Sequence, residues 1–154
     1  MSEMTVRRAR REDLPVIVGM LADDHLGAKR ESPDDLTSYE AAFATIDADP
    51  HQYLAICEVE GQIAGTMQLT VIPGLSHKGM TRLLIEGVRV HRDARSGGIG
   101  EALIKALQRR GADEGWTRIH WLTHESNERA RRLYDRFAPP TGFIQYRIPV
   151  DGDA

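Results

Sequence analysis

The 154-residue sequence contains one cysteine, Cys57, so no disulfide can form within the chain. Small secreted domains usually depend on several disulfides, and a chain without them is typical of a reducing compartment. Cys57 lies in the apolar run 53–59, where a thiol is expected to be a small buried hydrophobe rather than a nucleophile.

Long apolar runs are also missing. No run approaches the roughly 20 residues of a membrane-spanning helix, and the polar segment 1–13 has no apolar signal-peptide core. We therefore expect a cytoplasmic protein that has no membrane partner.

The sequence has no large excess of one charge. Its formal net charge is -3, which gives no reason to expect nucleic acid as the main partner. His120 and His124 are four residues apart on a predicted strand, but no third ligand stands at a suitable spacing. We expect no metal; either histidine can belong to a proton relay or be structural.

The apolar periodicity predicts one α/β domain over residues 1–154, of the mixed α+β kind, with a frayed tail at 151–154. Ser32 or Asp34 is the expected cap of the second helix, and Gly115 closes the third. Strands are predicted at 4–9, 53–59, 62–72, 81–90, 117–123 and 142–150, and helices at 11–27, 31–50, 98–115 and 125–137. The order β-α-α-β-β-β-α-β-α-β implies one mixed sheet covered by helices.

A glycine-rich corner, Arg95-Ser96-Gly97-Gly98-Ile99-Gly100, joins the strand at 81–90 to the next helix. Glycines at the start of a helix let backbone amides approach an anion closely, and Arg95 adds a positive charge. A P-loop would need Lys and Ser or Thr after Gly100, where Glu101 and Ala102 stand. The dinucleotide fingerprint would need glycine at Leu103.

The corner matches the pattern Arg/Gln-x-x-Gly-x-Gly/Ala, and with its position and the element order the chain resembles the GNAT superfamily of acetyl-CoA-dependent N-acetyltransferases. The resemblance covers nearly the whole chain. It implies a mostly antiparallel sheet of six to seven strands with about four helices, and acetyl-CoA as cosubstrate without a metal. It also implies that the sheet opens between the strands at 81–90 and 117–123. The residues it assigns to acetyl-CoA are Val88, Arg89, Val90, Arg95, Ser96, Gly97, Gly98, Ile99, Gly100, Glu101 and Asn127.

The resemblance further assigns Tyr134 as the acid that protonates the departing thiolate, and Glu86 suits the base that deprotonates the amine. An alkylammonium has a pKa of roughly 10.4 and a thiol of roughly 8.5, so both proton transfers need help. Simple alternation puts Glu86 on one strand face with Leu84, Val88 and Val90. Tyr134 can instead be an aromatic residue of the core, and Glu86 can instead be a salt-bridged or edge-exposed glutamate.

We expect a small-molecule amine as acceptor and an enzyme of the acyltransferase class. The alternatives are a protein or peptide N-terminus as acceptor, a non-catalytic acyl-CoA-binding regulatory module, and a nucleotide-binding domain. Asp23, Asp24 and Glu31 can attract a cationic amine. The segment Pro139-Pro140 departs from the family's usual short turn and affects the acceptor rim. Members of this superfamily often form homodimers, so we also expect a homodimer.

Overall fold

The computed structural model describes residues 3–151. The chain divides into two compact units, Met1–Leu122 and Thr123–Ala154, which are described separately. Of the predicted frayed tail at 151–154, residues 152–154 lie outside the described residues.

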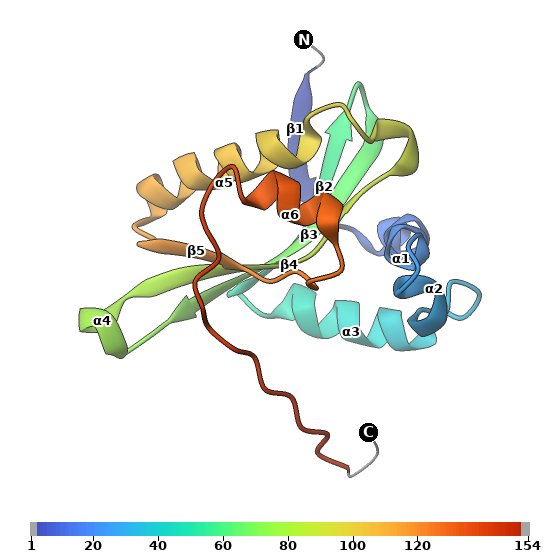
Figure 1. Cartoon of the computed structure of the whole chain (residues 1–154). Coiled ribbons are helices and arrows are strands. Elements are labelled where there is room, and N and C mark those ends of the chain that lie inside the picture. Colours follow the sequence, from blue (N-terminus) through green and yellow to red (C-terminus); the bar gives the residue numbers. More distant parts are fainter. Residues whose placement is uncertain (1–2, 152–154) are drawn as a thin grey trace. The chain divides into compact units, whose positions relative to one another are not determined.

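The first unit contains a five-stranded sheet in the order β1-β2-β3-β4-β5 (Figure 1). The first four strands are antiparallel to their neighbours, and β5 is parallel to β4. The strands are β1 Met4–Arg8, β2 Gln52–Val59, β3 Gln62–Pro73, β4 Thr81–Val90 and β5 Arg118–Trp121. Glu60 and Gly61, both at positive φ, form the tight β2–β3 turn that the sequence predicts.

Helices cover both faces of this sheet. In Figure 1, α5 lies on one face, and α1 and α3 lie on the other. The elements of the first unit are η1 Arg11–Asp13, α1 Leu14–Ala22, α2 Gly27–Arg30, α3 Thr37–Ala48, α4 Ser76–Gly79, η2 Arg92–Ala94 and α5 Ile99–Glu114. The short α4 turn falls in the predicted loop at 73–79 and contains left-handed residues at His77 and Lys78.

The sheet separates two apolar clusters. On the α5 face, Leu103 and Leu107 pack with strand residues that include Leu83 and Ile85. On the other face, Ile17 of α1 packs with Ile56, and Phe43 of α3 adds to this cluster. Cys57 is buried in the first cluster, and burial followed by the charge of Glu58 raises the pKa of its thiol. The expectation that Cys57 is buried is confirmed.

The predicted helix over 11–27 is too long, because α1 ends at Ala22 and Gly27 begins α2. The predicted ends of the helix at 98–115 are confirmed. Gly98 and Gly115 both adopt left-handed conformations and bound α5, as glycine does with little strain. The predicted caps Ser32 and Asp34 are wrong, because α3 begins at Thr37 after Leu36 and has no side-chain cap. The chain from 31 to 36 does not enter the helix.

A bulge changes the face pattern of β4. Glu86 lies opposite Gln68 and Arg89 opposite Thr66, so two β4 residues, Gly87 and Val88, face Met67 alone. Gly87 has φ +60°, which suits the extra residue of a bulge. Val88 and Val90 therefore pack on the α5 face with Ile85.

The second unit contains α6, Glu128–Tyr134, and no strand among its described residues. The predicted strand at 142–150 is wrong. Its alternation is present, but Ile144, Tyr146, Ile148 and Val150 are all exposed. Alternation describes which side chains share a face, whereas a strand also needs a hydrogen-bonded neighbour.

No helix within residues 3–151 is long and apolar enough to cross a membrane.

A carboxylate at the start of α1 fastens the first strand to the helical layer. Asp13, only 5% exposed, accepts hydrogen bonds from Nη1 and Nη2 of Arg7 at 2.7 and 3.0 Å. It also accepts one from the Arg10 amide, and Arg7 bonds Glu58 of β2. The hydrogen bonds from Arg7 hold the pKa of Asp13 below its ordinary value, and burial opposes them only in part.

Replacing Asp13 by Asn is expected to lower the free energy of unfolding by about 2–4 kcal/mol, because Arg7 then loses its buried anion. The folded-state pKa of Asp13 is depressed. Its contribution is therefore present above the unfolded pKa of about 4 and is lost as pH falls further. Urea unfolding at pH 7 and at pH 3 would show a difference between wild type and variant that shrinks in acid. Asp47→Asn is the control, since its contact with Arg8 is long, at 3.8 Å, and half-exposed. Equal losses in the two variants would contradict this role.

Candidate functional site

The sheet opens between β4 and β5 at one definite point. Their pairing runs from Arg82 opposite Arg118 to Ile85 opposite Trp121. Strand β4 continues to Val90, but β5 ends at Trp121. From Glu86 onward, β4 pairs only with β3 among the described strands. The main chain of Val88, Arg89 and Val90, predicted to serve the cofactor, lies along this open edge.

The glycine corner follows directly. The η2 turn leads into Arg95 and Ser96, and Gly98 is the N-cap of α5 with φ +72°. No side chain caps this helix, so its first turn presents amides and the positive end of the helix dipole. Ile99 is buried in the core, which fixes the start of α5 on the sheet, and Glu101 pairs with Lys105 along the helix. The corner therefore has the local geometry of an anion site.

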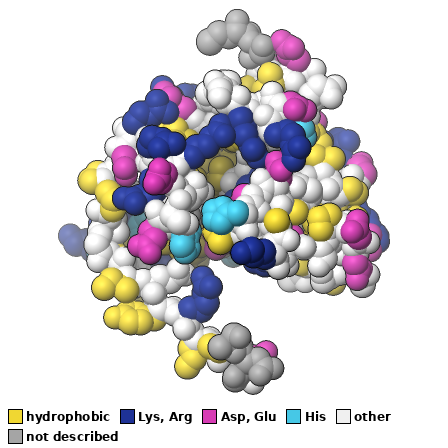
Figure 2. Space-filling view, turned by 45° about the vertical axis from the view of Figure 1, so that its right-hand side comes forward, with side chains coloured by type: hydrophobic (Ala, Val, Ile, Leu, Met, Phe, Trp, Pro, Cys, Tyr) yellow, Lys and Arg dark blue, Asp and Glu magenta, His cyan; other side chains and the backbone are white. Residues whose placement is uncertain are grey.

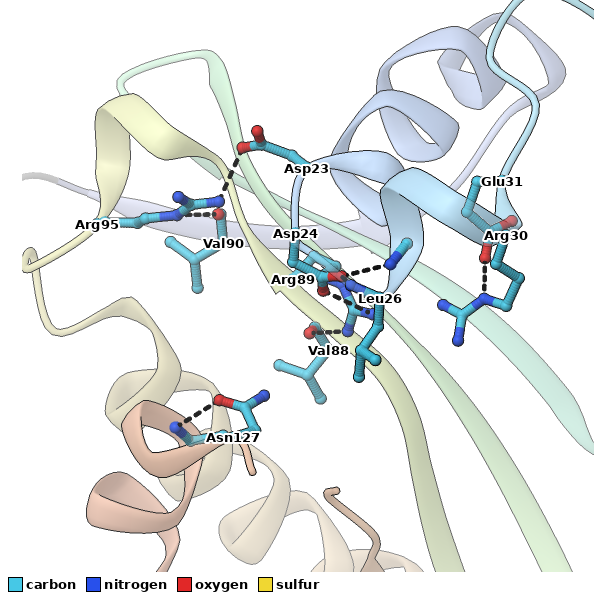
Figure 3. Close-up of polar contacts among 12 residues, drawn as sticks. Asp23, Asp24, Leu26, Arg30, Glu31, Val88, Arg89, Val90, Arg95 and Asn127 are labelled. Atoms are coloured by element: carbon cyan, nitrogen blue, oxygen red, sulfur yellow. Dashed lines mark hydrogen bonds and ion pairs between the residues drawn. The ribbon is translucent and has the colours of Figure 1, made fainter. Parts of the chain in front are cut away.

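Asp23, at the end of α1, draws the arginines of the corner toward itself. One carboxylate oxygen accepts a hydrogen bond from Arg92. The other accepts a hydrogen bond from Arg95 at 2.8 Å (Figure 3). Arg95 also donates to the Val90 carbonyl at 3.2 Å. The hydrogen bond from Arg92, with the charges of both arginines, holds the pKa of Asp23 below its ordinary value. The end of α1 and the glycine corner are thus joined by ion pairs.

The neighbouring Asp24 performs a second linking role. Its Oδ1 accepts from the amides of Leu26 and Gly27 at the start of α2, and its Oδ2 lies 3.3 Å from Nη2 of Arg89 on β4 (Figure 3). Burial would raise the pKa of Asp24, but these amides and Arg89 outweigh it and the pKa is lowered. The Arg89 Nε is buried without a hydrogen-bond partner among the described residues.

The acidic residues expected to attract a cationic amine are already matched by cations. Besides Asp23 and Asp24, Glu31 pairs with Arg30 at 2.6 Å and accepts from the Tyr39 hydroxyl. On the face shown in Figure 2, Lys and Arg side chains lie beside Asp and Glu side chains. Each of these three carboxylates therefore has an arginine of the protein as its partner.

Glu86 requires a correction. Its predicted face-sharing with Val88 and Val90 is wrong, because the bulge at Gly87 sends those two valines to the α5 face. Glu86 is exposed and shares the opposite face with half-buried Leu84. It is also the first β4 residue beyond the paired part of β5, so it lies at the start of the opening.

Asn127 and Tyr134, the other predicted site residues, are both in the second unit. Asn127 is the N-cap of α6, and its Oδ1 accepts from the Ala130 amide at 3.1 Å (Figure 3). Tyr134 is the last residue of α6 and is half-buried. His124, predicted to share a strand face with His120, lies beyond the end of β5 and bonds Ser126 instead.

Sequence reasoning missed the partners of the arginines. The acidic pair Asp23 and Asp24 was noted only as a possible attraction for an amine, although Gly27 three residues later signals a turn there. Ion pairs between residues 69 and 72 positions apart leave no local signal. Within residues 3–151, no three His, Cys, Asp or Glu side chains are grouped as metal ligands would be.

Comparison with known proteins agrees with this geometry. Residues 15–138 match the model of the Acetyltransferase (GNAT) family. A solved transcriptional regulator from Bacillus halodurans C-125 is 34% identical, with 96% of this chain and 99% of that chain covered and a TM-score of 0.87. Among curated proteins, no match is found.

Two more distant structures share the fold. A ribosomal-protein-alanine N-acetyltransferase from Brucella melitensis biovar Abortus 2308 is 19% identical, with coverage of 96% and 99% and a TM-score of 0.74. A predicted acetyltransferase from Clostridium acetobutylicum, solved with acetyl-CoA, is 17% identical, with coverage of 94% and 96% and a TM-score of 0.69.

The family match spans most of the chain, and the open strand edge and glycine-capped helix lie within it. The chain belongs to the GNAT family of acetyltransferases and is an acyltransferase that uses acetyl-CoA.

Proposed function

We propose that the protein transfers the acetyl group of acetyl-CoA to a primary amine of a small molecule, by direct attack within a ternary complex. The observation that carries this proposal is the coincidence of two features on one strand. The β4 edge is open from Glu86 to Val90, and the strand leads into a helix whose N-cap is a glycine. An extended thioester arm and a pyrophosphate need these two surfaces in this order.

The roles of the chain's residues follow from their chemistry. The loop Arg95–Gly100 holds the pyrophosphate by backbone amides, and the main chain of Val88–Val90 lies along the pantetheine arm, with Asn127 as a further contact. Glu86 is exposed at the start of the opening, so solvent reaches it and it can accept the amine's proton directly or through water. Tyr134 is proposed as the acid for the thiolate.

A peptide N-terminus is the second acceptor class, favoured by the shared fold with the ribosomal-protein-alanine N-acetyltransferase. The name of the Bacillus halodurans relative, a transcriptional regulator, suggests a regulatory module that binds acyl-CoA. We also propose that residues 1–154 form one domain, that the protein is cytoplasmic and that it forms a homodimer. The buried free thiol of Cys57 suits a reducing compartment.

The cofactor site is tested by titrating the protein with acetyl-CoA in a calorimeter, beside Gly98→Asp. We expect micromolar binding by wild type and a loss of at least about tenfold in the variant, because a carboxylate then faces the pyrophosphate. Gly61→Asp is the matched control. Gly61 has φ +76° against +72° for Gly98, and an added Cβ meets nothing within 4 Å at either position. If both variants bind like wild type, the corner does not hold the pyrophosphate.

The acid is tested by Tyr134→Phe, with thiol release from acetyl-CoA as the assay. Loss of the phenolic proton is expected to lower kcat by about 10²- to 10⁴-fold with little change in acetyl-CoA affinity. Tyr146→Phe removes a hydroxyl from a side chain that is 87% exposed and should leave kcat unchanged. A kcat within twofold of wild type in the Tyr134 variant would favour the core-aromatic interpretation.

Asp23 competes with the cofactor's phosphates for Arg92 and Arg95 in this proposal. Asp23→Asn is therefore expected to tighten acetyl-CoA binding by about two- to fivefold at low salt, with a smaller gain at high salt. Asp113→Asn removes an equal charge near the far end of α5 and should leave the Kd unchanged. Weaker binding by the Asp23 variant would instead show that this carboxylate holds the arginines in their binding position.

A further inference from the structure

A row of polar side chains crosses the sheet face opposite α5. The α5 face of β4 and β5 is apolar, since Leu83, Ile85, Ile119 and Trp121 pack in the α5 cluster. Strand alternation therefore puts the intervening residues on the other face. The cross-strand register groups there Gln52 of β2, Gln68 and Thr70 of β3, Arg82, Leu84 and Glu86 of β4, and Arg118 and His120 of β5.

Two arginines in this row stand directly opposite each other. Arg82 pairs with Arg118 in the β4–β5 register. Like charges in directly opposed positions destabilise a sheet. Neither arginine forms an ion pair with an acidic side chain of the described residues. The arginines of the corner, by contrast, are matched by Asp23 and Asp24. Arg82 and Arg118 thus place two positive charges side by side on one sheet face.

His120 and Glu86 extend the site toward the opening. His120 lies opposite Leu84, two residues along from the arginine pair. Partial desolvation of the exposed ring first, and then the charges of Arg82 and Arg118, lower the pKa of His120. The neutral ring donates one hydrogen bond and accepts another. Glu86 is two residues further along β4, at the point where β5 pairing has ended. Cations and a carboxylate therefore occupy the two ends of one stretch of strand.

The uncharged polar side chains of β2 and β3 beside this stretch of β4 are bonded to one another. The Gln52 Oε1 accepts hydrogen bonds from Gln68 Nε2 at 2.9 Å and from Thr70 Oγ1 at 3.0 Å. Gln68 is directly opposite Glu86, and Thr70 is opposite Leu84. A hydroxyl- or amide-bearing ligand lying over β4 would find hydrogen-bonding groups on this side. The α5 face of β4 and β5, by contrast, is lined by the apolar side chains of the core.

Resting on the proposed function, we propose that this face binds the acceptor, and that the acceptor is an amine that also carries a carboxylate or a phosphate. Its anionic group contacts Arg82 and Arg118, and its amine is directed along β4 to Glu86. The Cα atoms of Arg82 and Glu86 are four residues apart, about 13 Å at the usual strand rise. Both side chains can lean along the strand, so an amine and an anion separated by about five to eight bonds can bridge them.

The test compares amines that differ only in the anion. The carboxylate arm uses 6-aminohexanoate against 1-aminohexane, and the phosphate arm uses 5-aminopentyl phosphate against 5-aminopentanol. Thiol release from acetyl-CoA gives kcat/KM for wild type, Arg82→Gln and Arg118→Gln. Wild type should prefer at least one anionic amine over its neutral counterpart by about tenfold or more, since charge-assisted hydrogen bonds to arginine are the strong ones. Each variant should lose that preference through KM, and the arm that responds identifies the anion.

Arg109→Gln provides the matched control, because Arg109 is an exposed arginine of α5, and it should keep the preference. All variants should retain the wild-type Kd for acetyl-CoA. Equal kcat/KM for the anionic and neutral amines in wild type, or an unchanged preference in both β-strand variants, would overturn the proposal.

A calorimetric titration with the two anionic amines separates this proposal from the proposed function. If no amine releases thiol, but wild type binds an anionic amine and both variants lose that binding, the anion site stands and the acetyltransfer proposal fails. If wild type binds neither anionic amine, or the variants bind them equally well, the arginine pair is a solvated feature of the sheet and this inference fails.

Discussion

The end of β4–β5 pairing at Ile85 and Trp121 is the constraint on which the rest of the site depends. In a parallel strand pair, the main-chain N–H and C=O groups on the facing edges form hydrogen bonds with each other. Because β5 stops while β4 continues to Val90, the following five residues of β4 keep one edge without a strand neighbour among the described residues. The open edge leads into the glycine corner, so a linear ligand meets main-chain groups first and the helix start next.

The bulge at Gly87 divides the chemistry of the strand at the same place. Before it, Leu83 and Ile85 are buried against α5; after it, Val88 and Val90 take over that face. The shift leaves Glu86 and Arg89 directed away from α5, toward the side of α1 and α2, where Arg89 meets Asp24. One extra residue thus keeps the α5 face of β4 apolar and places the ionisable groups on the opposite face.

Charge is distributed unevenly along the β4 face opposite α5. Near the corner, Asp23 and Asp24 match three arginines and tie the α1–α2 segment to β4 and the loop. Ion pairs of this kind are weak individually when exposed, so an arriving polyanion can compete for them. At the other end of β4, Arg82 and Arg118 stand together, and neither forms an ion pair with an acidic side chain within residues 3–151. The contrast is what points to a ligand there.

The sequence by itself determined the features that depend on nearby residues. Gly98 and Gly115 bound α5 because their left-handed conformations are local, and alternation with a Glu-Gly turn predicts the β2–β3 hairpin. The glycine corner and the family resemblance rest on contiguous residues. Only the tertiary structure decided the face of Glu86, the arginine partners of Asp23 and Asp24, and the meeting of Arg82 with Arg118. Strand register, a bulge and a long-range ion pair depend on neighbours distant in sequence. For the same reason the alternating segment 142–150 misled, because alternation does not supply the strand that would pair with it.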